Sequence, residues 1–275
     1  MPSPGKLFLC TLLLIIGGTT IWIGFRYQQQ RDVIRLIDEH HGYAETVSIY
    51  PLWADQLLLN ALEEDATDGF RSVAKVSLRH ASIGERDLLR MSCLKDLEIL
   101  YLHDTQVTDA GIRHLEGLTK LEQLDLSNTK ISDAGLEHLR QLANLQSLDI
   151  SDTQLTDAGL QHLTCLSGLE LLDLSNTDVS DAGMEHLSAL TSLEVLALWG
   201  TPVGDAGLEH LGRLTDLRWL DLSCTRVTDE GLEHLSSLTN FEVLNLSNTE
   251  VTDVSVNRLR QQLPDCEIEH SRASD

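Results

Sequence analysis

The chain has 275 residues, of which 42% are apolar and only 4% aromatic, and its 43 acidic and 20 basic residues give a formal net charge of −23. The apolar share argues against wholesale disorder, and the scarcity of aromatics means that aliphatic side chains must build the core. The negative charge excludes general nucleic-acid binding, which needs Lys and Arg to displace phosphate counterions, and it disfavours a polybasic membrane-surface mode.

An uncharged stretch follows a short N-terminal tail, residues 1–6. Residues 7–25 read LFLCTLLLIIGGTTIWIGF and contain no Asp, Glu, Lys or Arg. At about 1.5 Å per helical residue, this stretch can span the roughly 30 Å hydrocarbon core of a bilayer. A cleaved signal peptide is the alternative, but the apolar run resumes at residues 21–23 and no small-residue cleavage site stands out. The pattern favours an uncleaved, single-pass transmembrane anchor.

The charges beside this anchor bear on membrane topology. Lys6 precedes the stretch, whereas Arg26, Arg31 and Arg35 follow it. This excess of basic residues after the stretch favours the cytoplasmic side for the domain that follows. Long soluble domains are also translocated regardless of charge, so both sides stay open.

Residues 26–72 are expected to form a juxtamembrane helix and an N-terminal cap. A helix is expected over 26–41, a strand over 42–50, where apolar and polar residues alternate, and an apolar helix over 53–62. A repeat array needs such a cap, because its first apolar layer would otherwise face water.

A 24-residue repeat occupies residues 73–264, and residues 265–275 supply a closing strand and a tail. The unit that begins at Leu121 reads LEQLDLSNTKISDAGLEHLRQLAN. A degenerate copy begins at Val73. Complete copies begin at Leu97, Leu121, Leu145, Leu169, Leu193, Leu217 and Phe241.

The two halves of each unit have different periodicities. Apolar residues alternate in the LxxLxLxx half, which predicts a strand, and recur every three residues in the DAGLxHLxxL half, which predicts a helix. At the helix start a hydroxyl residue and an Asp, such as Ser132 and Asp133, can accept from free helix N–H groups. One unit cannot bury its leucines alone. Stacked units predict an α/β, right-handed solenoid with parallel strands on the concave face and short helices on the convex face.

The repeat resembles the leucine-rich-repeat family. The resemblance rests on the LDLSNT segment from Leu124, the DAGLEHL segment from Asp133 and their copies, and it covers about residues 73–270. The layout is similar to membrane-anchored bacterial leucine-rich-repeat proteins and to the repeats of F-box substrate adaptors, although no F-box segment is found. The family's usual Asn is replaced by a column of threonines whose hydroxyls can bond the turn backbone: Thr105, Thr129, Thr153, Thr177, Thr201, Thr225 and Thr249.

The outward positions of the strands hold the candidate binding residues. The repeat from Leu193 departs from the others, because it has Ala197 instead of Asp and Trp199 instead of Ser. An exposed Trp on an acidic sheet is where binding energy tends to concentrate. The predicted partner-binding residues are Trp199 and Trp219 as anchors, Leu171, Val195 and Val243 as an apolar strip, Asp125, Asp149, Asp173 and Asp221 as an acidic rim, and Tyr101 and His103 as a second, weaker spot.

Two regular columns of ionisable residues could bind ions. The aspartates at the outward strand positions could hold calcium, yet LDLS is the ordinary filling of the repeat. The other column lies on the convex side, where a packing role is favoured over a metal-binding or pH-sensing ladder. It consists of His114, His138, His162, His186, His210 and His234.

The sequence gives no sign of an enzyme, a cofactor or a metal site. It has no phosphate-binding glycine loop, no HExxH and no Ser/His/Asp order, and its carboxylates form a regular array rather than one unlike pocket. We expect a membrane-anchored module that binds a protein on its concave face, with a basic patch on the partner favoured by charge complementarity. The alternatives are a ubiquitin-ligase adaptor, by repeat similarity alone, and an ion-binding structural repeat protein.

Overall fold

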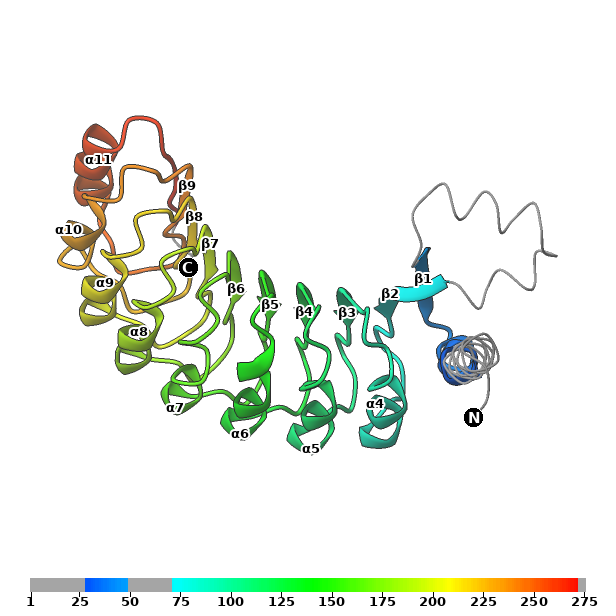
Figure 1. Cartoon of the computed structure of the whole chain (residues 1–275). Coiled ribbons are helices and arrows are strands. Elements are labelled where there is room, and N and C mark those ends of the chain that lie inside the picture. Colours follow the sequence, from blue (N-terminus) through cyan, green and yellow to red (C-terminus); the bar gives the residue numbers. More distant parts are fainter. Residues whose placement is uncertain (1–27, 49–70, 272–275) are drawn as a thin grey trace, which may run out of the picture.

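The computed structural model describes residues 28–48 and 71–271, which build one curved array (Figure 1). A ten-stranded sheet runs in chain order from β1 to β10. The pair β1–β2 is antiparallel, and every later pair is parallel. The sheet lines the inside of the arc and the helices cover its outside. The predicted solenoid, with strands on the concave face and helices on the convex face, is confirmed.

The elements are short, as a 24-residue period requires. A helix spans 28–39. The strands are β1 (Tyr43–Ser48), β2 (Arg71–Ser77), β3 (Ile99–Tyr101), β4 (Gln123–Asp125), β5 (Ser147–Asp149), β6 (Leu171–Asp173), β7 (Val195–Ala197), β8 (Trp219–Asp221), β9 (Val243–Asn245) and β10 (Glu267–Glu269). The helices are α4 (Glu85–Met91), α5 (Asp109–Ile112), η2 (Arg113–Leu115), α6 (Asp133–Leu136), η3 (Glu137–Gln141), α7 (Asp157–Leu160), α8 (Asp181–Leu187), α9 (Asp205–Leu211), α10 (Leu232–Leu235) and α11 (Asp253–Gln262).

The leucines of successive repeats form one continuous core. Leu100 pairs with Leu124, which pairs in turn with Leu148, and the central residue of each further strand continues the row. The side chains of this row are at most 1% exposed from β3 to β9, and Ile268 of β10 is 6% exposed. Each fully buried leucine contributes about 1.5–3 kcal/mol relative to an exposed one. The core therefore depends on every repeat having a neighbour on each side.

The threonine column closes the turn that follows each strand. Thr105 donates its hydroxyl hydrogen to the carbonyl oxygen of Leu102 at 2.7 Å. The six later threonines make the same bond at 2.6 to 2.7 Å. Each hydroxyl bonds within its own repeat, as expected, and gives the carbonyl at the end of the strand a hydrogen-bond donor.

An aspartate at the start of each helical half ties its repeat to the next one. Oδ1 of Asp109 accepts from the N–H of Ser132 at 2.8 Å, and Oδ2 accepts from the Ser132 hydroxyl at 2.7 Å. The later repeats make these bonds at 2.6 to 2.9 Å, with one bond at Gly204, which has no hydroxyl. We call these residues the Asp clamp: Asp109, Asp133, Asp157, Asp181, Asp205 and Asp229.

The clamp corrects the expected role of these aspartates. They bond across to the next repeat instead of capping their own helix. Hydroxyl capping, the other expected role, is seen at Thr156, which accepts from the N–H of Ala158 at 3.3 Å, and at Thr252, which accepts from Ser255 at 3.4 Å. The recurring Ser/Thr–Asp pair therefore mainly joins repeats.

The glycine of the DAG segment makes room for the clamp. A Cβ added at Gly135 would lie 2.6 Å from Oδ1 of Asp109. The corresponding glycines of the next three repeats would place a Cβ 2.5 to 2.7 Å from a clamp carboxylate. Real Cβ atoms essentially never approach so closely, so at these four glycines a side chain would force the clamp carboxylate to move.

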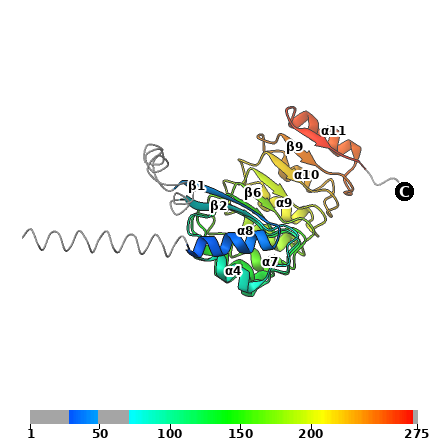
Figure 2. The ribbon, with the colours of Figure 1, turned by 90° about the vertical axis from the view of Figure 1, so that its right-hand side faces the viewer.

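The N-terminal end of the array is covered by the helix at 28–39 and by β1. Val33, Leu36 and Ile37 of the helix are 1 to 2% exposed. Arg90 of α4 donates to the carbonyl oxygen of Asp32 at 3.3 Å, and Figure 2 shows this helix beside α4. The first leucine layer is thereby shielded from water.

The predicted anchor at 7–25 and the predicted helix at 53–62 lie outside the described residues. Within 28–48 and 71–271, no helix is both long enough and apolar enough to cross a membrane.

The clamp predicts a strong coupling between Asp109 and Gly135. Asp109→Ala leaves the N–H and hydroxyl of Ser132 without their partner and should cost about 1–3 kcal/mol of unfolding free energy. Gly135→Ala should also lower the unfolding free energy of the wild type. In the Asp109→Ala background its cost should be much smaller, or the variant should even be stabilised, because the clamp carboxylate is gone and Ala is a better helix former than Gly.

Urea denaturation of the two single variants and the double variant measures this coupling. Gly168→Ala is the control, because its Cβ would have no neighbour closer than 3.9 Å. If Gly135→Ala lowered the unfolding free energy equally in the wild type and in Asp109→Ala, the clamp would be contradicted.

Candidate functional site

The concave face consists of three columns of side chains that alternate with the buried leucines. Strand pairing aligns the residues of each column across the sheet. Backbone bonds such as His80 N–H to the His103 carbonyl, at 2.9 Å, extend this alignment past the strand ends. The first column is Lys75, Ile99, Gln123, Ser147, Leu171, Val195, Trp219, Val243 and Glu267; the second is Ser77, Tyr101, Asp125, Asp149, Asp173, Ala197, Asp221, Asn245 and Glu269; the third is Arg79, His103, Ser127, Ser151, Ser175, Trp199, Ser223 and Ser247.

The apolar strip of the first column is continuous. Leu171, Val195, Trp219 and Val243 occupy paired positions on β6 to β9, and each is partly exposed. The structure thus places these four predicted residues side by side.

Trp199 is the exception in the third column. Its side chain is 43% exposed, whereas the serines at the same position in the neighbouring repeats are 5 to 8% exposed. In the second column the same repeat has Ala197, which is 7% exposed. A large aromatic side chain therefore follows a small one on the concave face, and the small one, Ala197, lies between it and the apolar strip.

The aspartates of the second column are bonded locally. Oδ1 of Asp221 accepts from the N–H of Ser223 at 2.8 Å and from its hydroxyl at 2.5 Å. Asp125 and Asp149 accept the same pair of bonds from the serines two residues later. These carboxylates are fixed by the strand end and are partly buried, so the acidic rim is a rigid row rather than a set of mobile surface charges.

Asp173 has the most perturbed carboxylate of this row. Burial raises its pKa above the ordinary value of 3.8, and the charges of Asp149 and Asp221 raise it further, while the bonds from Ser175 oppose the shift. The row therefore concentrates negative charge that a cation would relieve.

The N-terminal end of the face carries a basic and aromatic cluster. The Arg79 guanidinium lies 4.3 Å from the centroid of the Tyr101 ring, and its Nη2 lies 3.4 Å from Oδ2 of Asp125. The rings of His80 and His103 meet edge to face at 5.2 Å. Tyr101 and His103 thus belong to a larger group than the sequence indicated.

The sequence analysis missed Arg79, His80 and Lys75 as members of this face. The Lys75 ammonium lies 5.4 Å from the Tyr101 ring. A signal was present, since counting 24 residues back from Ile99 and His103 leads to Lys75 and Arg79. The degenerate first repeat hid it.

The histidine column lies on the convex side, and its first members make pairwise contacts with glutamates. Nδ1 of His138 lies 2.6 Å from Oε1 of Glu116, and Nε2 of His114 lies 3.7 Å from Oε1 of Glu85. In the described part of the chain, no three His, Cys, Asp or Glu side chains are grouped so that they could hold a metal ion. These contacts support the packing interpretation over the metal ladder.

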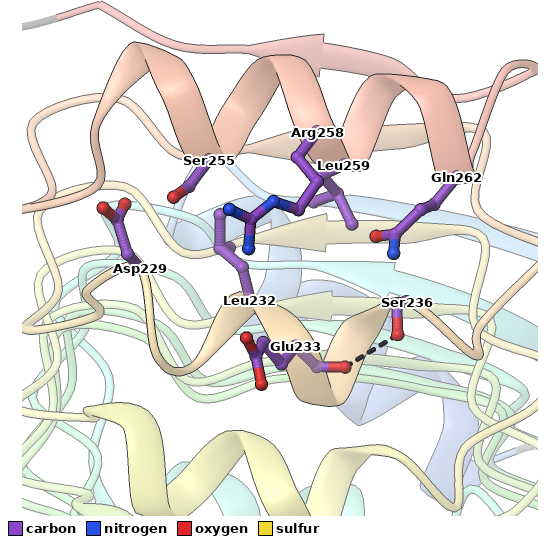
Figure 3. Close-up of a pocket in the computed structure, with 8 residues that line it drawn as sticks. All are labelled: Asp229, Leu232, Glu233, Ser236, Ser255, Arg258, Leu259 and Gln262. Carbon is purple, nitrogen blue, oxygen red and sulfur yellow. Dashed lines mark hydrogen bonds between the residues drawn. The ribbon is translucent and has the colours of Figure 1, made fainter.

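A polar groove of about 300 Å³ separates α10 and α11 on the convex side (Figure 3). Figure 3 shows Arg258 and Gln262 of α11 extending toward α10. At this junction Ser255 replaces the glycine of the DAG segment, so a side chain stands where earlier repeats have none. The three columns of the concave face lie on the other side of the array.

Comparison with known proteins places the chain in a family. A family model described as a leucine-rich repeat region matches residues 76–271. The chain therefore belongs to the leucine-rich-repeat family, as the repeat predicted. The members of this family are typically protein-interaction modules and generally non-catalytic.

Two solved structures illustrate the likeness. Internalin C2 of Listeria monocytogenes is 26% identical, with a TM-score of 0.60 over 76% of this chain and 84% of that chain. A leucine-rich-repeat protein of Leptospira interrogans is 20% identical, with a TM-score of 0.48 over 66% of this chain and 50% of that chain. A search of curated proteins found no match.

The raised pKa of Asp173 predicts a stabilising substitution. A carboxyl group whose pKa is raised by folding contributes stability at acid pH that is lost as the pH rises above 3.8 and through the folded pKa. Asp173→Asn removes the charge and can keep the backbone bond, because Oδ1 of Asn245 accepts from Ser247 N–H at 3.0 Å. We expect its Tm to exceed that of the wild type at pH 7 by on the order of 2 °C.

Thermal melts between pH 3 and pH 7 test this expectation. The gain in Tm of Asp173→Asn over the wild type should shrink toward pH 3, where the Asp173 carboxyl becomes protonated. Asp125→Asn is the matched control, because it removes a carboxylate that Arg79 already pairs with, and it should bring no gain. A lower Tm of Asp173→Asn at pH 7 would contradict the interpretation.

Proposed function

We propose that this leucine-rich-repeat protein is a non-enzymatic module that binds a protein partner on its concave face, and that residues 7–25 anchor it in a membrane. The family supplies the general class of function. The site within the face and the anchor are argued from the residues.

The exposed Trp199 beside the apolar strip carries the proposal. Binding energy in protein interfaces concentrates on a few aromatic anchors surrounded by residues that exclude water. Trp199 and Trp219 match that pattern, with Val195 and Leu171 on adjoining strands. In the repeats from Leu121 to Leu169 and in the repeat from Leu217, the position of Trp199 holds a buried serine, which offers little apolar area.

Charge favours a partner with a basic surface. The chain carries a net charge of −23, and Asp125, Asp149, Asp173 and Asp221 line the face that holds the two tryptophans. Opposite charge on a partner accelerates encounter and fixes orientation more than it increases affinity.

The proposed anchor would hold the repeat domain at a membrane. Residues 7–25 hold no charged side chain and are long enough to cross a bilayer as a helix. Anchoring would confine a captured partner to the membrane surface and raise its local concentration. The basic residues after the stretch favour the cytoplasmic side for the repeats.

Capture by the full-length chain tests the binding face. The double variant Trp199→Ala, Trp219→Ala should lose a specific protein that the wild type retains, because it removes both anchors. The control is Leu89→Ala, Val254→Ala, which truncates two exposed apolar side chains, 53% and 71% exposed, on α4 and α11 of the convex side. Retention of every protein by the tryptophan variant would move the site away from the concave face.

Fractionation of cells that express the full-length chain tests the anchor. The wild type should remain in the membrane pellet after an alkaline carbonate wash. A variant with Leu14→Arg and Ile15→Arg should be released, because each charge near the bilayer centre costs about 2.5–3.5 kcal/mol. Wild-type protein in the supernatant would contradict the anchor.

A further inference from the structure

The concave face already holds one guanidinium, that of the chain's own Arg79. It stacks on the Tyr101 ring at 4.3 Å and reaches Oδ2 of Asp125 at 3.4 Å. An aromatic side chain and an aspartate of the second column thus form a platform for a planar cation. Arginine suits such a platform, because its guanidinium both stacks on aromatic rings and pairs with carboxylates.

A different arrangement of an aromatic residue and aspartates surrounds Ala197. Strand pairing sets Asp173 and Asp221 on either side of Ala197, with Trp199 two residues further along the same repeat. Across β4 to β9, the three columns contain no Lys or Arg. These columns therefore supply no cation of their own to the aromatic and acidic residues around Ala197.

Ala197 makes the space for such a cation. The neighbouring repeats have Asp at this position, and its replacement by Ala leaves a short side chain between two carboxylates. With strands about 4.8 Å apart, Asp173 and Asp221 stand roughly 10 Å apart along the sheet, which leaves room for a side chain between them.

The two carboxylates are poised to accept bonds from a ligand. The serine two residues later bonds Oδ1 in each case. Within residues 71–271, Oδ2 of Asp221 receives no hydrogen bond. Burial and the neighbouring charges already raise the pKa of Asp173, so a bound cation would relieve an unfavourable concentration of negative charge.

We propose that Ala197 is the floor of a subsite for an arginine side chain of the partner, whose guanidinium stacks on Trp199 and pairs with Asp173 and Asp221. The proposal rests on the proposed function and specifies the chemistry that the partner must present. An arginine flanked by aliphatic residues would place its neighbours on the apolar strip of β6 to β9. Lysine fits less well, because its compact ammonium is not planar and spans a shorter distance between two carboxylates than a guanidinium does.

Binding of short peptides to the full-length chain tests the subsite. The probes are fluorescein-labelled pentapeptides with a central arginine between leucines, and the same peptides with citrulline or lysine at the centre. Citrulline keeps the shape of arginine and removes its charge. By fluorescence anisotropy, the arginine peptide should bind at least about tenfold more tightly than the citrulline peptide.

Variants locate the preference. The preference for arginine over citrulline should disappear in the double variant Asp173→Asn, Asp221→Asn. The arginine peptide should not bind Ala197→Arg, because the new side chain fills the subsite. Asp125→Asn is the matched control and should keep the preference, since that carboxylate serves Arg79. Asn245 shows that the fold accepts Asn in this column, and a thermal melt of each variant confirms folding.

Several results would overturn the subsite: equal affinity for the arginine and citrulline peptides, a lysine peptide that binds as tightly, a preference that survives in the Asp173→Asn, Asp221→Asn variant, or no binding of the arginine peptide. If the arginine preference is absent while Trp199→Ala, Trp219→Ala still loses its protein, the subsite fails and the proposed function stands. If the tryptophan variant retains every protein, the proposed function fails.

Discussion

The Asp clamp fixes the distance and the register between successive repeats, and the composition of the concave face depends on it. Each clamp carboxylate binds one N–H and, where present, one hydroxyl of the next repeat, and in all but the last of these repeats a glycine leaves space for the carboxylate. An inserted or deleted residue would break both bonds and misplace the glycine. The period therefore stays at 24 residues, and side chains of one kind align in columns.

This constraint leaves few positions free for function. Leucines fill the core, threonines close the turns, clamp aspartates join the repeats, and the aspartates of the second column bond the strand ends. The first column of the concave face varies along its whole length, and the second and third columns depart most from the repeat at the basic cluster around Tyr101 and at Ala197 and Trp199. Both lie on the concave face, so the departures from the repeat, rather than the repeat itself, distinguish this member of a large family.

Much of this architecture follows from periodicity alone. A strand half and a helix half at constant spacing predict the solenoid, the leucine core and the alignment of Leu171, Val195, Trp219 and Val243. Periodicity cannot tell whether Asp133 caps its own helix or reaches Thr156 of the next repeat, because both arrangements recur every 24 residues. It also cannot reveal Arg79 on Tyr101, since that contact depends on a degenerate repeat and on side-chain conformation. The site residues and the anchor remain predictions.

Hydroxyl-radical footprinting of the full-length chain, alone and with its captured partner, would test the binding face most directly. Trp199 is exposed and readily oxidised in the free protein, while Leu89 on α4 reports on the convex side. We predict that the partner protects Trp199 and Trp219 and leaves the oxidation of Leu89 unchanged. Protection of Leu89 with unchanged oxidation of both tryptophans would contradict a concave binding site.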